Sequence, residues 1–267
     1  MSRTGQIFAL SLALAAPLGA VAEEIVTVSG RPGATQSYLL LYDAPPPAAV
    51  AVLFPGGEGL LGLRVEGGTV KFRQHGNFLV RTRTLLRDRQ VAVAVVDSPS
   101  DQQRLGMDDG FRTGRAHVAD VAAVVKDLRQ RFPGAKIFLI GTSRGTISAA
   151  YAGRALSSAI DGVILTSSVF YGPRHGGGIG IASFDFAAIK APLLFVHHRY
   201  DACRSCPYNV AESLGKTYPL ITVIGGKPAE SDPCEPFAAH GYFGKEAETV
   251  AAIRNWMLGQ VFPTAVD

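Results

Sequence analysis

The fold is decided by Lys136-Ile137-Phe138-Leu139-Ile140-Gly141-Thr142-Ser143-Arg144-Gly145-Thr146-Ile147-Ser148-Ala149-Ala150. A short apolar run leads into a G-x-S-x-G pentapeptide, and an alanine-rich run follows it. This order predicts a strand, a sharp turn and a helix, with Ser143 exposed at the turn in a strained conformation of positive φ. Gly141 and Gly145 fit such a turn because a Cβ atom at either position would crowd the neighbouring backbone. The free N–H groups at the helix N-terminus then face the serine, which suits a developing negative charge.

The composition is that of an ordinary globular protein. The chain has 267 residues, of which 47% are apolar and 18% are charged, which is enough for one large core. We therefore expect a single domain over residues 23–267. The formal net charge is +4, and five arginines gather before the apolar run 91–96: Arg73, Arg81, Arg83, Arg87 and Arg89. No nucleic-acid-binding motif accompanies them, so we interpret them as a solvated helix face and expect no nucleic-acid partner.

The first residues have the pattern of a secretory signal. Arg3 supplies a positive start, residues 7–18 form an apolar run, and Ala20-Val21-Ala22 matches an A-x-A cleavage site. This pattern predicts a signal peptide over residues 1–22 and a mature chain that is periplasmic or secreted. The apolar run is too short for a good transmembrane span, so we expect no stable membrane insertion of the mature chain.

Strands and helices are predicted to alternate along most of the chain. Apolar or alternating runs indicate strands at 24–28, 36–42, 48–54, 91–96, 136–140, 162–166, 192–198 and 220–224. Helices are expected at 77–89 with Asn77 as its cap, at 114–131, after the pentapeptide, at 209–218 and at 246–258. This alternation predicts an α/β fold with a mostly parallel sheet and helices on both faces. The segment between 166 and 192 is short for a lid domain.

Four groups follow predicted strands, where the loops of a parallel sheet gather at one edge. They are the glycine loop at Gly56-Gly57, the serine Ser143, the acid Asp201 and the base His240. A serine hydroxyl needs a base to take its proton, and a carboxylate orients the histidine that serves as this base. Asp97 also ends a predicted strand and is the alternative acid.

The segments Phe54-Pro55-Gly56-Gly57, Gly141 to Gly145, Asp201 and His240-Gly241 resemble, in kind and order, those of α/β-hydrolases. The resemblance runs from about Glu24 to the end and is strongest to small, lid-poor bacterial dienelactone hydrolases and carboxylesterases. It implies ester cleavage through an acyl-enzyme on a serine of a Ser-Asp-His triad, with no cofactor or metal. The substrate would be a small-molecule or polymeric ester. An acyltransferase or a peptidase uses the same triad, and a catalytically silent binding protein can keep the same fold.

The resemblance also assigns roles to single residues. It implies Ser143 as nucleophile, His240 as general base and acid, and Asp201 as the orienting acid. It implies an oxyanion hole formed by the backbone N–H groups of Arg144 and Gly57. Because Pro55 stands where many relatives have histidine, Gly56 and Glu58 are kept as alternative second donors.

The three cysteines flank the expected catalytic loops. Cys203 and Cys206 follow Asp201, and Cys234 precedes His240. If the acid and the base touch, these cysteines come close together. We therefore predict a disulfide from Cys234 to Cys203 or to Cys206, with Cys203 slightly favoured, because the sequence does not fix the connectivity. The C-x-x-C spacing is also found in redox proteins, but no helix opens at this motif as it does there.

Two neighbouring groups have a structural interpretation. Arg144 flanks the nucleophile, and Arg199 and Arg204 flank the acid. We expect ion pairs with Asp101, Asp108 or Asp109 here, with binding of an anionic part of the substrate by one of these arginines as the alternative. His197-His198 ends a predicted strand, and these two histidines alone are too few for a metal site, so structural roles are favoured.

Overall fold

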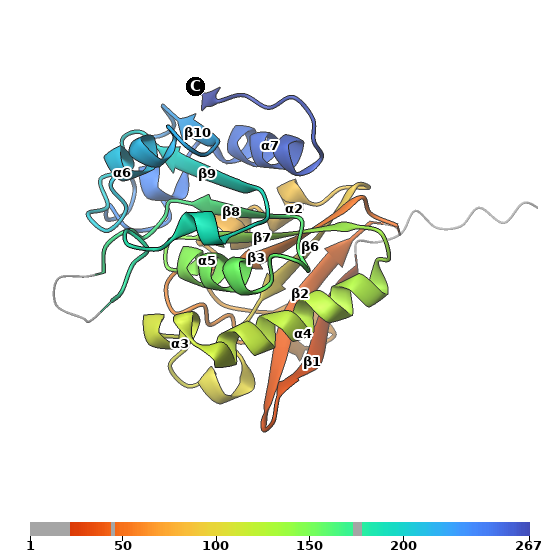
Figure 1. The fold of residues 1–267 in the computed structure, drawn as a ribbon. Coiled ribbons are helices and arrows are strands. Elements are labelled where there is room, and N and C mark those ends of the chain that lie inside the picture. The colour runs from red at the N-terminus through yellow and green to blue at the C-terminus, as the bar shows by residue number, and fades with distance from the viewer. Residues whose placement is uncertain (1–21, 44–45, 173–177) are drawn as a thin grey trace, which may run out of the picture.

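The computed structural model describes residues 22–43, 46–172 and 178–267. The predicted signal peptide therefore lies, except for Ala22, outside the described residues. The main sheet has nine strands in the order β1-β2-β6-β3-β7-β8-β9-β10-β11 (Figure 1). The strands are β1 (Ala22–Arg31), β2 (Ala34–Tyr42), β3 (Ala49–Phe54), β6 (Val91–Val96), β7 (Lys136–Thr142), β8 (Gly162–Thr166), β9 (Leu193–His198), β10 (Leu220–Val223) and β11 (Ala265–Val266).

Most neighbouring strands in this sheet run parallel. Only β1 with β2 and β2 with β6 pair antiparallel, and every other pair from β6 to β11 is parallel. Parallel strands need long crossover connections, and helices supply them here. The predicted α/β fold with a mostly parallel sheet is confirmed.

Helices cover both faces of the sheet. They are α1 (Phe78–Arg81), α2 (Arg83–Leu86), α3 (Asp109–Thr113), α4 (Arg115–Arg131), α5 (Gly145–Ala155), α6 (Tyr208–Leu214) and α7 (Glu246–Met257). In Figure 1, α4 and α5 lie in front of the sheet and α2 lies behind it. Strand β3 shows why both faces need cover: its six residues are all buried, and they alternate between a core on the α4–α5 face and a core on the α2–α7 face.

Four local features differ from the sequence prediction, and the first is the short helix α3, where no helix is predicted. The single helix expected at 77–89 is two short helices, α1 and α2, with Thr82 at φ −95° and ψ 2° between them. Thr82 Oγ1 donates to the Phe78 carbonyl, a bond that competes with the helical ladder. A hairpin of β4 (Arg64–Glu66) and β5 (Thr69–Lys71) occupies a stretch with no regular pattern in the sequence. Strand β11 was not predicted, because two residues carry no periodic pattern.

The connection between β8 and β9 carries no lid domain in its described residues, 167–172 and 178–192. It contains only one short 3-10 helix, η2 (Phe186–Ala188). The carboxyl ends of the central strands are therefore not covered by an inserted domain from this connection.

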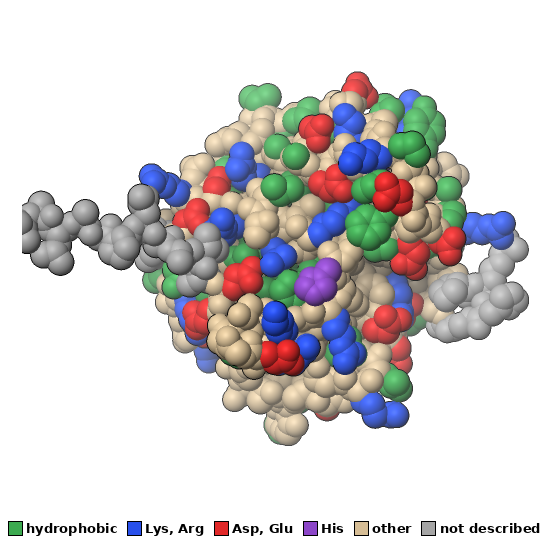
Figure 2. All heavy atoms as spheres, turned by 180° about the vertical axis from the view of Figure 1, so that it is seen from behind, with side chains coloured by type: hydrophobic (Ala, Val, Ile, Leu, Met, Phe, Trp, Pro, Cys, Tyr) green, Lys and Arg blue, Asp and Glu red, His purple; other side chains and the backbone are tan. Residues whose placement is uncertain are grey.

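The arginines before β6 are largely engaged in ion pairs. Arg81 pairs with Glu246 at 2.9 Å, Arg83 with Glu23 at 2.9 Å, and Arg87 with Asp43 at 2.6 Å. Seen from behind, basic and acidic side chains are interspersed over the surface (Figure 2). Only 15–17% of each of these three side chains is exposed, so they are engaged in partly buried ion pairs rather than forming the solvated helix face that was expected. Among the described residues, no helix combines the length and the apolar character that a membrane crossing requires.

Candidate active site

The turn between β7 and α5 has the predicted form. Ser143 has a φ of 51°, in the left-handed region that a serine rarely adopts, so the positive φ expected there is confirmed. Its N–H donates to the Thr166 carbonyl at 3.1 Å, which fixes the turn to β8. A Cβ atom on Gly145 would collide with the Phe54 carbonyl and lie 2.8 Å from that of Pro55. The helix can approach β3 this closely only because a glycine stands there.

His240 and Asp201 are brought together although 39 positions separate them. His240 Nδ1 lies 2.9 Å from Asp201 Oδ2, and both side chains are buried. Asp201 follows β9, and its other oxygen accepts the N–H of Cys203 at 2.9 Å. With Nδ1–H donated to the carboxylate, His240 Nε2 is left as a proton acceptor.

The backbone around His240 is held by two residues that the sequence analysis did not single out. Ser167 Oγ donates to the His240 carbonyl at 2.7 Å. The Tyr242 hydroxyl donates to the Val196 carbonyl at 2.7 Å and accepts the N–H of Ser167 at 2.9 Å. Ser167 and Tyr242 have φ values of 43° and 57°, so both sit in strained conformations. Neither residue lies in a motif that marks a positive φ, as G-x-S-x-G does for Ser143, and these positions were missed for that reason.

The glycine loop after β3 lies directly against the serine. A Cβ atom on Gly56 would be 2.9 Å from Ser143 Cβ, so only glycine permits this approach. Gly57 has a φ of 55°. Within the described residues, the N–H groups of Gly57 and Arg144 have no hydrogen-bond partner, and the same holds for Gly56 and Glu58. The loop therefore offers free donors beside Ser143, and all three candidate second donors remain open.

One pocket of about 550 Å³ contains the proposed machinery. Its lining includes Gly57, Ser143, Arg144 and His240. No hydrogen bond joins Ser143 Oγ to His240 in the described part of the chain. Such bonds are often long in free enzymes and shorten when substrate binds.

Two amide side chains in the pocket wall were not predicted to be part of a site. Gln74 and Asn77 both line the pocket, and the amide oxygen of each is buried without a partner among the described residues. Gln74 also has a φ of 59°. Asn77 occupies the N-cap position of α1, as predicted, but its side chain makes no capping hydrogen bond among the described residues.

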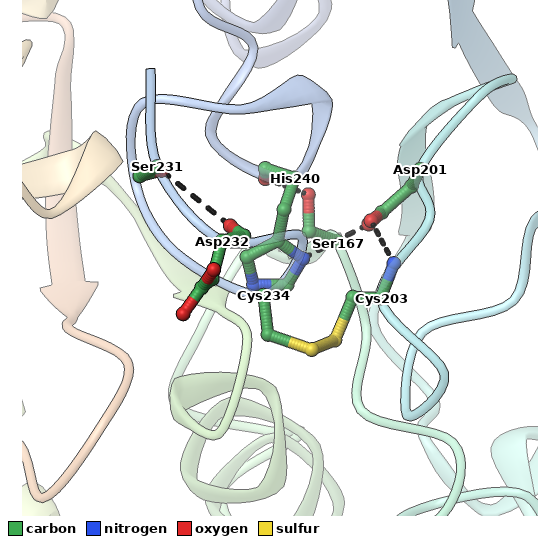
Figure 3. The surroundings of a disulfide bond; sticks show 7 residues. All are labelled: Ser167, Asp201, Cys203, Ser231, Asp232, Cys234 and His240. Atoms are coloured by element: carbon green, nitrogen blue, oxygen red, sulfur yellow. Dashed lines mark hydrogen bonds and ion pairs between the residues drawn. A yellow bond between two sulfur atoms is a disulfide. The ribbon is translucent and has the colours of Figure 1, made fainter. Parts of the chain in front are cut away.

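Cys203 and Cys234 lie beside Asp201 and His240, as Figure 3 shows. The structure contains a disulfide between Cys203 and Cys234, the pairing that the sequence slightly favoured. It connects the loop after Asp201 to the loop before His240. Cys206 is a buried free thiol. A crosslink of this kind typically stabilises a protein by about 2–4 kcal/mol.

Counting thiols tests this arrangement. The unreduced protein is expected to show one reactive thiol, that of Cys206, after denaturation. The native protein is expected to show none, because burial raises the pKa of the Cys206 thiol well above its ordinary value. Titration with a chromogenic disulfide reagent, with and without denaturant, measures both. Three thiols in the denatured protein would contradict the disulfide.

The neighbouring charged residues have structural partners. Arg144 pairs with Asp109 at 2.8 Å, as expected, rather than being free for an anionic substrate. Asp97, the alternative acid, accepts N–H groups from residues 61–63 and does not contact His240. It fixes the segment after the glycine loop.

His197 and His198, at the end of β9, do not form a metal site with other described residues. His197 Nε2 accepts the N–H of Ser168 at 2.7 Å, and burial lowers the pKa of His197 to about 3, so the ring is neutral. His198 Nε2 lies 2.9 Å from the Gly225 carbonyl. The potential ligand atoms of Cys203, Cys206 and His240 lie within 4.8 Å of one another. Cys203 is oxidised, however, so this cluster does not offer three metal ligands.

One family model matches part of the chain. The family model described as "Serine aminopeptidase, S33" matches residues 100–200. No curated protein matches the chain.

Solved structures match most of the chain at low identity. A lidless α/β serine hydrolase from Xanthomonas campestris is 16% identical, covers 91% of this chain and 95% of its own, and gives a TM-score of 0.55. A dienelactone hydrolase from Anabaena variabilis is 13% identical, with 90% and 99% covered and a TM-score of 0.61. Est1E from Butyrivibrio proteoclasticus with bound ferulic acid is 16% identical, with 88% and 98% covered and a TM-score of 0.59. The chain has the α/β-hydrolase fold.

Proposed function

We propose that the protein is a serine hydrolase that cleaves carboxylic esters through an acyl-enzyme on Ser143. The observation that carries this proposal is the arrangement at one pocket. Ser143 has a φ of 51°, His240 is bonded to Asp201 at 2.9 Å, and unpartnered N–H groups lie beside the serine. Nucleophile, base, orienting acid and oxyanion donors are the components that acyl transfer requires.

In the proposed reaction, His240 Nε2 takes the proton of Ser143 Oγ as the oxygen attacks the ester carbonyl. The N–H groups of Arg144 and of the glycine loop, with Gly57 as first candidate, stabilise the resulting oxyanion. His240 then gives the proton to the departing alcohol. It next activates the water that hydrolyses the acyl-enzyme, while Asp201 holds the ring and stabilises the imidazolium. No step requires a cofactor or a metal.

The pocket supports a small or medium-sized ester as substrate. A volume of about 550 Å³ lies within the usual range for small-molecule sites. Est1E, which shares this fold, has been crystallised with ferulic acid, so a methyl ester of ferulic acid is a reasonable probe. The family model matched at residues 100–200 is described as an aminopeptidase, so amide substrates belong in the same test.

We further propose that the protein acts outside the cytoplasm. The signal-like residues 1–22 and the disulfide support this location, since disulfides persist in oxidising compartments.

A fluorophosphonate probe applied together with substrate panels tests the function. The mature wild-type protein is expected to be labelled on the peptide that contains Ser143, as located by mass spectrometry. It should also hydrolyse p-nitrophenyl esters of short and medium chain length faster than the matching p-nitroanilides. Protein denatured before labelling is the control and should remain unlabelled. Faster cleavage of anilides would favour a peptidase, and transfer of the acyl group to an added alcohol in preference to water would favour an acyltransferase. A folded protein that neither labels nor turns over any substrate would exclude the proposal.

A further inference from the structure

Arg112 is a buried cation directly behind the glycine loop. It lies on α3, and its relative exposure is 0%. Its Nη1 donates to Ser148 Oγ of α5 at 2.8 Å, and its Nη2 donates to the Gly57 carbonyl at 3.0 Å. Among the described residues, no carboxylate lies within 4.0 Å of the guanidinium, because Asp109 pairs with Arg144 instead. The two hydrogen-bond partners of Arg112 are thus neutral oxygens.

Placing a cation there has a cost. Removing a charge from water without a close counter-ion is unfavourable by several kcal/mol in real proteins. Burial lowers the pKa of Arg112 to about 9, which reflects this cost and still leaves the group charged at neutral pH. Gly59 makes room for it, since a Cβ atom there would lie 2.7 Å from Nη2. A position that serves packing alone is filled at lower cost by an apolar side chain.

The carbonyl groups of the glycine loop are all tied to the protein. The Gly56 carbonyl accepts the N–H of Gly59 at 3.1 Å, and the Glu58 carbonyl accepts that of Met107 at 2.8 Å. The Gly57 carbonyl, between them, accepts only from Arg112 among the described residues. In a trans peptide the C=O and N–H groups point in opposite directions. Arg112 therefore fixes the peptide plane between Gly57 and Glu58, so that the N–H of Glu58 points to the side opposite Arg112.

Both residues of that peptide line the pocket, whereas Arg112 does not. We propose that Arg112 is a positioning residue that holds the Gly57–Glu58 peptide so that the N–H of Glu58, one of the alternative second donors, can bind the oxyanion, while its positive charge favours the anionic intermediate. This inference rests on the proposed function, because it concerns the same reaction. Ser148 completes the arrangement by linking the guanidinium to the helix that carries the nucleophile at its N-terminus.

The test uses Arg112→Met, which keeps the length of the side chain but removes its charge and donors, and Arg112→Lys, which keeps the charge. Active sites are counted with the fluorophosphonate probe, so that a smaller folded fraction does not lower the apparent kcat. The readouts are kcat, KM, and the inhibition constants of a trifluoromethyl ketone and of its methyl ketone analogue. The fluorinated ketone forms an anionic tetrahedral adduct on the serine, and the methyl ketone does so far less readily. Val125→Ala, on the buried face of α4, is the control for lost stability.

Arg112→Met is expected to lower kcat and the affinity for the trifluoromethyl ketone together, on the order of 10²-fold, with little change in KM or in methyl ketone affinity. Arg112→Lys should have a kcat and a trifluoromethyl ketone affinity about tenfold higher than those of Arg112→Met, because lysine keeps the charge but lacks the planar guanidinium with its paired donors. Val125→Ala should lower the melting temperature and leave both ketone constants unchanged.

Three results would overturn the inference. The first is an Arg112→Met protein with wild-type kcat per active site. The second is a loss that appears equally in both ketones or only in KM. If Arg112→Met does not fold, the test relies on Arg112→Lys, whose kcat and affinity for the trifluoromethyl ketone should be about tenfold below those of the wild type. Wild-type values for Arg112→Lys would then be the third contrary result. A wild-type protein that is not labelled and shows no turnover overturns the proposed function itself, and this is seen before any variant is made.

Discussion

Replacing Ser143 with alanine is expected to lower kcat for esters by about 10⁶-fold, the effect typical of removing a serine nucleophile. The reason is chemical rather than structural. Without Oγ no acyl-enzyme forms, and the only remaining catalysis comes from the oxyanion donors and from substrate binding. The measurement is single-turnover and steady-state hydrolysis of the best p-nitrophenyl ester, with the fluorophosphonate adduct as an independent readout.

The fold should survive this change. Alanine in the left-handed region costs roughly 1–2 kcal/mol, and serine already bears a similar cost at this φ of 51°. Ser213→Ala, at an exposed position of α6, is the matched control and should keep wild-type turnover and labelling. If Ser143→Ala retained more than about a hundredth of the activity with a normal melting temperature, another residue would be the nucleophile and the role given to Ser143 would be wrong.

The strand–turn–helix at 136–155 shows how much a sequence can predict. Apolar runs and glycine punctuation are local signals, so they placed the central strands, the turn at Ser143 and the loops that carry Asp201 and His240. The predicted sheet then accounts for the meeting of Asp201 and His240, because parallel strands place their following loops at one edge. Topology, rather than any sequence motif, relates these distant positions.

Other features of the site leave no local signal. Arg112 stands among other charged residues in the sequence, and its burial behind the glycine loop results from how α3 packs against α5. Tyr242 supports the His240 segment from a strained conformation that tertiary packing imposes. Asn77 stands at the predicted N-cap, yet the helix after it is one turn long, its side chain makes no capping hydrogen bond, and the residue also lines the pocket. For Arg112 and Tyr242 the deciding partners are far away in the chain.

Gly145→Ala is expected to cost about 3–5 kcal/mol of the free energy of unfolding, a large share of the roughly 5–15 kcal/mol of a typical domain. The φ of Gly145 is not in the left-handed region, so the requirement for glycine is purely steric. The added methyl group would collide with the Phe54 carbonyl at the end of β3 and lie 2.8 Å from that of Pro55. Neither neighbour can move easily, because β3 is buried in the centre of the sheet.

Chemical denaturation of Gly145→Ala and of Gly134→Ala separates steric collision from backbone strain. Gly134 has a φ of 84°, and a Cβ atom there would meet no other atom within 4 Å, so alanine should cost only the conformational penalty of roughly 1–2 kcal/mol. Gly145→Ala should be clearly less stable, and any folded fraction should react slowly with the fluorophosphonate, because α5 must shift and carry Ser143 away from the glycine loop. Equal losses in the two variants would mean that β3 and α5 can separate without penalty. The close approach of the helix to the strand would then not be what holds the nucleophile in place.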